Sequence, residues 1–158
     1  MNHIPPWLKV AESIARRGVL EVPGGQHNSD ILDFGRAVDL AVTTDEIPWC
    51  SNFVNYCFMQ CDIERTRSAA ARSWLKWGVR LPLEYPALGA VCVMKRGGGN
   101  QPGRDVIRAK AHVGFFIGRP SPWEVTVLSG NQNNSVCERN YPIGRVIDYR
   151  WPAEEKTA

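Results

Sequence analysis

A cysteine stands at the predicted start of an amphipathic helix, a position that suits a catalytic nucleophile. After Pro48 and Trp49, apolar residues recur at intervals of three and four from Cys50 to Cys61, which is the pattern of one helix face. Because proline is tolerated at the start of a helix but not in its interior, Cys50 falls in the first turn. The free N–H groups and the positive end of the helix dipole favour a thiolate there. We therefore interpret Cys50 as a nucleophile, against the alternative of a small buried hydrophobic residue.

The other cysteines lack this setting. Cys57 and Cys61 lie further along the same apolar face and are predicted to be core residues, Cys92 lies within a β-rich run, and Cys137 follows a polar turn. An odd total of five, with no secretory signal at the start of the chain, favours free thiols made in a reducing compartment. A zinc site built from Cys57, Cys61 and two histidines is a second hypothesis, although no Cys-x-x-Cys or paired-histidine spacing supports it.

A nucleophilic cysteine needs a nearby base, which is most often a histidine. The chain has three histidines. His3 lies in the terminal segment, which is a poor place to hold catalytic geometry. His27 lies in a glycine-containing loop, and we interpret it as a solvated polar residue. His112 begins an apolar run that alternates like a strand. A histidine on a strand is often only a hydrogen-bonded core residue. However, a rigid strand can also hold the imidazole ring close to a helix terminus. We therefore predict that His112 is the base.

A polar run after the next predicted strand offers an orienting group for this imidazole. If the strand that begins at His112 and the strand that ends near Gly130 form a hairpin, the far end of the second returns to the level of the histidine. Ser129, Asn131 or Gln132 would then lie beside the ring, and an amide oxygen there would fix its tautomer. Strand geometry makes Asn131 the first candidate and leaves Ser129 and Gln132 open.

Helical patterns precede strand patterns along the chain, which predicts an α+β fold with an antiparallel sheet. Helices are expected over 5–17, from Asn28 or Ser29 to Ala41, over 50–61 and over 69–77. Strands are expected over 89–94, 111–117, 124–128 and 146–149, with a turn over 118–122. The chain reads as one domain, 1–158, with a core over about 5–152 and a frayed polar tail over 153–158.

Composition limits the classes of partner. The formal net charge of +3 is too small to indicate nucleic acid, and no apolar stretch has the length of a membrane span. We therefore expect no nucleic-acid partner, no stable membrane insertion and a monomer. The basic loop from Lys95 to Lys110 either rims a cleft that favours an acidic peptide or is simply solvated, and the sequence favours neither.

The motifs, taken in order, resemble the papain-like cysteine peptidoglycan hydrolases of the NlpC and CHAP type, and among them a group of small phage and prophage lysis proteins. The resemblance covers about residues 7–152. Its motifs are Pro48-Trp49-Cys50-Ser51-Asn52-Phe53-Val54, Ala71-Arg72-Ser73-Trp74-Leu75, Gly89-Ala90-Val91, His112-Val113-Gly114-Phe115 and Ser129-Gly130-Asn131-Gln132. Two positions depart from the pattern: Trp49 replaces the aspartate usual in NlpC enzymes, and Ser129 replaces the glutamate frequent in CHAP enzymes.

This resemblance implies a papain-like fold, with N-terminal helices on a C-terminal sheet, and a site of Cys50, His112 and Asn131 without cofactor or metal. It implies hydrolysis of an amide bond of bacterial peptidoglycan through a thioester, as a stem-peptide endopeptidase or a muramoyl-alanine amidase. Cys50 would be held as a thiolate, His112 would protonate the leaving amine and later activate water, and the Cys50 N–H would donate to the oxyanion.

The biological setting stays open at this point. The same chemistry would serve a phage endolysin, made in the host cytoplasm without a signal peptide and acting on the wall after release, or a secreted antibacterial effector. A non-catalytic cell-wall-binding module that keeps the fold is a further alternative.

Overall fold

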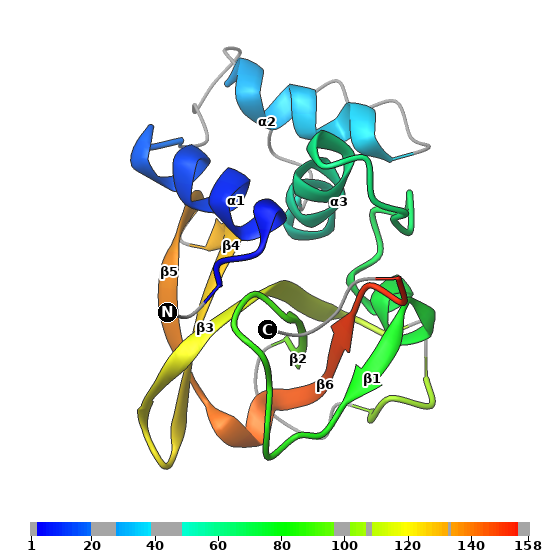
Figure 1. Cartoon of the computed structure of the whole chain (residues 1–158), viewed down its shortest axis with the longest axis vertical. Coiled ribbons are helices and arrows are strands. Elements are labelled where there is room, and N and C mark those ends of the chain that lie inside the picture. Colours follow the sequence, from blue (N-terminus) through cyan, green and yellow to red (C-terminus); the bar gives the residue numbers. More distant parts are fainter. Residues whose placement is uncertain are drawn as a thin grey trace.

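The protein folds as helices packed on an antiparallel sheet, and this confirms the α+β class. The computed structural model describes residues 3–19, 28–38, 49–96, 102–106, 109–132 and 134–154. Within these ranges, three α-helices gather on one side of a sheet of six strands, with α3 against β3 and β4 (Figure 1). None of the helices in the described ranges is long and apolar enough to cross a membrane.

The first helix begins and ends as its sequence predicts, whereas the second begins as predicted but its α-helical part stops at Phe34, before the expected end at Ala41. Helix α1 (Pro6–Arg16) has proline at its first position, and Gly18 follows it with a positive φ of 67°. Helix α2 (Ser29–Phe34) is capped by Asn28, whose side-chain oxygen accepts a hydrogen bond from the Asp30 N–H at 2.9 Å. A short 3-10 helix, η1 (Gly35–Ala37), follows. The expected continuation to Ala41 runs into positions outside the described residues.

Helix α3 (Cys50–Gln60) forms where the apolar spacing predicts it, but it lies at the centre of the core and also buries Ser51, Asn52 and Asn55, outside the predicted apolar face. Its Phe53 and Phe58 rings lie 6.2 and 5.8 Å from the ring of Phe115 on β3. Pro48, which was expected to fix the helix start, lies outside the described residues. The next predicted helix, 69–77, is a 3-10 helix, η2 (Ala71–Lys76).

The sheet contains two strands that the sequence patterns did not predict. Both lie at its edges, in the order β1-β6-β2-β3-β4-β5. Edge strands bury few side chains, so their sequences lack the apolar signal of a central strand. The strands are β1 (Val79–Leu81), β2 (Val91–Lys95), β3 (Ala111–Ser121), β4 (Glu124–Gln132), β5 (Ser135–Pro142) and β6 (Val146–Trp151).

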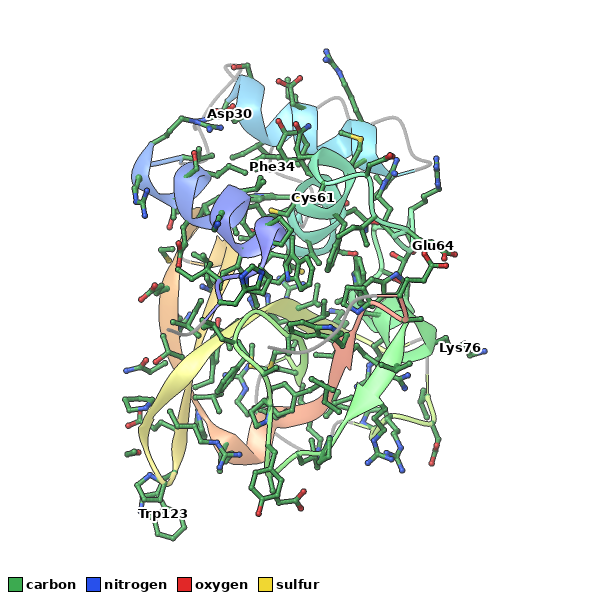
Figure 2. All side chains as sticks on the ribbon, in the orientation of Figure 1. Asp30, Phe34, Cys61, Glu64, Lys76 and Trp123 are labelled. Atoms are coloured by element: carbon green, nitrogen blue, oxygen red, sulfur yellow. The ribbon has the colours of Figure 1, made fainter. Side chains whose placement is uncertain are left out.

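Strands β3 and β4 form the expected hairpin, with Phe115 opposite Leu128. Strand β3 extends through Ser121, so the chain reverses later than the expected turn over 118–122. Trp123 occupies the turn, is 75% exposed, and projects from the tip of the hairpin, away from the helices (Figure 2). The hairpin returns the end of β4 to the level of the start of β3, which is the relationship that the site requires.

A buried arginine organises the chain just before β3. Arg72, in η2, has no exposed surface, and its guanidinium donates to four backbone carbonyls. The acceptors are Pro102 at 2.8 Å, Gly103 at 2.8 Å, Val106 at 2.9 Å and Lys110 at 3.3 Å. Because these contacts satisfy the planar fork of donors, this part of the basic loop is fixed against the core rather than merely solvated.

Candidate active site

The structure places Cys50 at the first position of α3, against the strand that carries His112. Its side chain is 4% exposed. The backbone N–H of Val113, the residue after His112, lies near enough to the sulfur to stabilise its thiolate. The N–H groups of Ser51 and of Cys50 itself act in the same direction. The helix start therefore surrounds the sulfur with donors, as expected for a nucleophile in the first turn.

Burial nevertheless decides the resting state of this thiol. Burial raises the pKa of Cys50, and the N–H of Val113, the charge of Arg96 and the N–H groups of the helix start lower it without reversing the shift. The expectation that the helix dipole and His112 hold a resting thiolate is therefore wrong. Desolvation of the anion outweighs the donors, and the resting group is the neutral thiol.

His112 is the second residue of β3, and its imidazole is 7% exposed. Its Nε2 lies 3.0 Å from the side-chain oxygen of Gln132 at the end of β4. Its ring centroid lies 5.9 Å from that of Tyr141 on β5, and the charge of Cys50 is among the influences that raise the pKa of this tyrosine. Three strands and one helix therefore bring Cys50, His112, Gln132 and Tyr141 into one neighbourhood.

The amide of Gln132 is oriented by its other contacts. Its Nε2 donates to the carbonyl of Cys137 at 2.6 Å and to that of Val127 at 3.2 Å, so its oxygen must serve as the acceptor. The Tyr141 hydroxyl donates to this oxygen at 2.8 Å. The same oxygen can then accept only from a protonated Nε2 of His112. The neutral imidazole therefore carries its lone pair on Nδ1, which is the nitrogen free to take a proton.

Gln132, and not Asn131, makes the hydrogen bond that orients the ring. Continuing the pairing of Phe115 with Leu128 would set Asn131 opposite His112, as the sequence suggested. However, Asn131 has a positive φ of 57°, and the β4–β5 register shifts between Ser129 and Gln132. This bulge adds one residue to β4, so the side-chain alternation slips and Gln132 reaches the imidazole.

The third candidate, Ser129, has a different task. Its hydroxyl is fully buried and donates to the carbonyl of Val113 at 2.5 Å. Gly114 leaves the room for this approach, because a methyl group at that position would lie 2.6 Å from the Ser129 Cβ. Ser129 therefore ties β3 to β4 beside the site without contacting the imidazole ring.

The environment of His112 keeps its ring neutral. Burial lowers the pKa of His112 to about 4, and the charges of Arg96, Arg145 and Arg139 contribute in the same direction. The hydrogen bond with Gln132 acts against them. At neutral pH the candidate pair is therefore an uncharged thiol and a neutral imidazole. Such a pair can act by moving the thiol proton to the imidazole as the sulfur attacks an electrophile.

The other histidines and cysteines lie in different surroundings. His3 is exposed, and His27 lies outside the described residues. Burial raises the pKa of the Cys57 and Cys92 thiols well above the ordinary range, as expected for core residues. Over the described ranges, no three His, Cys, Asp or Glu side chains gather as ligands for a metal ion.

Sequence reasoning missed Tyr141, which fixes the acceptor oxygen of Gln132. Its strand, β5, has three consecutive exposed residues, and this pattern hides the alternation that would have placed Tyr141 on the same face as the site. Trp74 is a core residue, and its indole N–H donates to the Ser51 hydroxyl at 3.0 Å.

Comparison with known proteins adds no assignment: no family model matches this chain, and no curated protein matches its sequence.

Proposed function

We propose that the protein is a papain-like cysteine hydrolase that cleaves an amide bond of bacterial peptidoglycan. The observation that carries this proposal is the chain of contacts at one site: Cys50 at a helix start beside the strand of His112, with the Nε2 of His112 held by Gln132. The choice of peptidoglycan rests on the resemblance of the sequence motifs. Stem-peptide endopeptidase and muramoyl-alanine amidase activities both fit this chemistry.

Acylation would begin from the neutral pair. Nδ1 of His112 takes the thiol proton while the Cys50 sulfur bonds to the carbonyl carbon, and the carbonyl oxygen becomes an oxyanion. The N–H of Cys50, which has no carbonyl partner within the helix because it lies in the first turn, is one donor for this oxygen. The oxyanion then collapses, the carbon–nitrogen bond breaks, and the imidazolium returns its proton to the leaving amine. The product of this step is a thioester on Cys50.

Deacylation would use the same two residues. Nδ1 of His112 takes a proton from water as the water oxygen attacks the thioester, and collapse of the second oxyanion breaks the carbon–sulfur bond. The proton on His112 returns to the sulfur and restores the thiol. Gln132 holds the ring through both steps, because its oxygen accepts from Nε2–H whether the imidazole is neutral or protonated.

The decisive experiment compares the wild type with Cys50→Ala on purified peptidoglycan, with release of fragments followed by mass spectrometry. We expect Cys50→Ala to abolish fragment release and leave the thermal melt nearly unchanged. Cys61→Ser is the matched control, because this thiol lies at the other end of the same helix, and it should retain activity. The masses of the fragments identify the bond that is cut.

Two results would overturn the proposal. Fragment release by Cys50→Ala would exclude a thioester on this residue, and its loss on adding a chelator would favour the zinc hypothesis. Binding of the wild type to cell walls without release of any fragment would identify a binding module that keeps the fold.

A further inference from the structure

Three arginines from separate elements lie close enough for their charges to act on the candidate base. Arg96 follows β2, Arg139 lies on β5 and Arg145 lies in the 3-10 helix η3 (Ile143–Arg145). The positive charge of each reaches His112, and that of Arg96 also reaches Cys50. They converge because the antiparallel sheet brings the end of β2 and one face of β5 to the start of β3.

Among the residues that the structure describes, no carboxylate forms an ion pair with Arg139 or Arg145, and an aromatic ring holds their guanidinium groups. Their central carbons lie 5.3 and 5.1 Å from the centre of the Tyr141 ring. Arg145 also donates to the Lys95 carbonyl at 3.0 and 3.2 Å. In the part of the chain that the structure describes, the ion pairs involve other arginines, such as Arg80 with Asp148.

This arrangement differs from an ordinary solvated surface. Arginines on a surface usually alternate with carboxylates, whereas here two like charges contact one aromatic ring. Keeping them together costs electrostatic free energy, and an anion bound between them would recover it. Their forked donors match the two oxygens of a carboxylate.

We propose that Arg96, Arg139 and Arg145 form a subsite that binds a carboxylate of the substrate beside the scissile amide. The substrate class is therefore an acidic peptide, and this inference rests on the proposed function. A bound carboxylate would also offset the positive charges around His112 and make the imidazole a stronger base. Substrate recognition and activation of the base would thus be coupled through the same three charges.

The test uses two synthetic stem peptides that differ only in whether the side carboxylates next to the scissile bond are free or amidated. Binding is measured to the Cys50→Ala protein, so that the result does not depend on turnover. We expect the free-acid peptide to bind about tenfold more tightly, with a difference that shrinks as salt is raised. Adding Arg139→Gln should remove most of this difference. Arg16→Gln, an exposed change of equal charge on α1, should leave it intact.

Equal binding of the two peptides by the Cys50→Ala protein would overturn the carboxylate subsite. So would a loss of affinity in Arg139→Gln that is the same for both peptides. These results leave the proposed hydrolase function standing. Discrimination between the peptides in binding, with no cleavage of either peptide or of peptidoglycan by the wild type, would instead support the subsite and overturn the hydrolase function.

Discussion

The side-chain oxygen of Gln132 lies 3.0 Å from Nε2 of His112, and two backbone carbonyls hold its amide in the orientation that makes this oxygen an acceptor. The contact fixes which ring nitrogen carries the proton. It also joins the ends of β3 and β4, so the same residue aligns the hairpin and prepares the base.

Replacing Gln132 should therefore impair catalysis more than replacing Asn131. We expect Gln132→Leu to lower kcat by about 10- to 100-fold, because the ring loses the acceptor that fixes its tautomer and orientation. Asn131→Ala should change kcat by less than about threefold. Steady-state kinetics on a defined peptide, with circular dichroism to confirm folding, make the comparison. A larger loss in Asn131→Ala would return the orienting role to the asparagine.

The low pKa of His112 sets the acid side of the pH–rate profile. The neutral imidazole is the base, and burial keeps it neutral down to about pH 4. The acid limb of kcat/KM should therefore lie near pH 4 rather than near the ordinary histidine value of 6.5. Arg139→Gln removes a positive charge that lowers this pKa, so it should move the limb to higher pH. A limb near 6.5 in the wild type would contradict the neutral buried imidazole.

The same shift makes folding stability depend on pH in a defined direction. His112 has a pKa of about 4 when folded and 6.5 in the unfolded chain, so the unfolded state binds more protons between these values. Its contribution to the free energy of unfolding is complete above pH 6.5 and falls by about 3 kcal/mol as the pH drops to 4. Urea unfolding at pH 7 and 4.5 measures the slope. His112→Gln should show a shallower dependence, and an unchanged slope would exclude His112 as its cause.

Arg72 should prove sensitive even to a conservative change. Lysine keeps the charge but cannot reach four carbonyls with one ammonium group, so Arg72→Lys should lower the free energy of unfolding by about 3 kcal/mol. Arg36→Lys, at a side chain that is 80% exposed, is the matched control and should change it by less than about 0.5 kcal/mol. Chemical denaturation of both variants tests the prediction. Equal stabilities would show that the buried contacts of Arg72 contribute little.

Much of the fold could be predicted from local patterns. The caps and spacing located α1, the start of α2 and the whole of α3, because helix signals are local. The central strands were predicted from their runs of β-forming residues. The edge strands β1 and β5 were not, since a strand that buries little has no need of an alternating apolar pattern.

The candidate site was predictable as far as its residues follow regular geometry. The positions of Cys50 and His112 could be predicted because one residue begins a helix and the other lies at the start of a strand, and sequence patterns locate both kinds of boundary well. The third position depends on a backbone bulge at Asn131, and a single added residue exchanges the two faces of a strand. The protonation state of Cys50 depends on burial, which is a property of the whole packed molecule and not of the helix start alone.

The contact between Gly130 and Trp49 has a consequence for how this protein can evolve. A methyl group at Gly130 would overlap the Trp49 ring, which lies immediately before Cys50. The two positions, 81 residues apart in the chain by number, are coupled in one direction. A larger residue at 130 requires a smaller one at 49 together with a shift of Phe53, whose Cβ would lie 2.9 Å from the added methyl group. A larger residue at 130 should therefore appear only in relatives that also differ at 49.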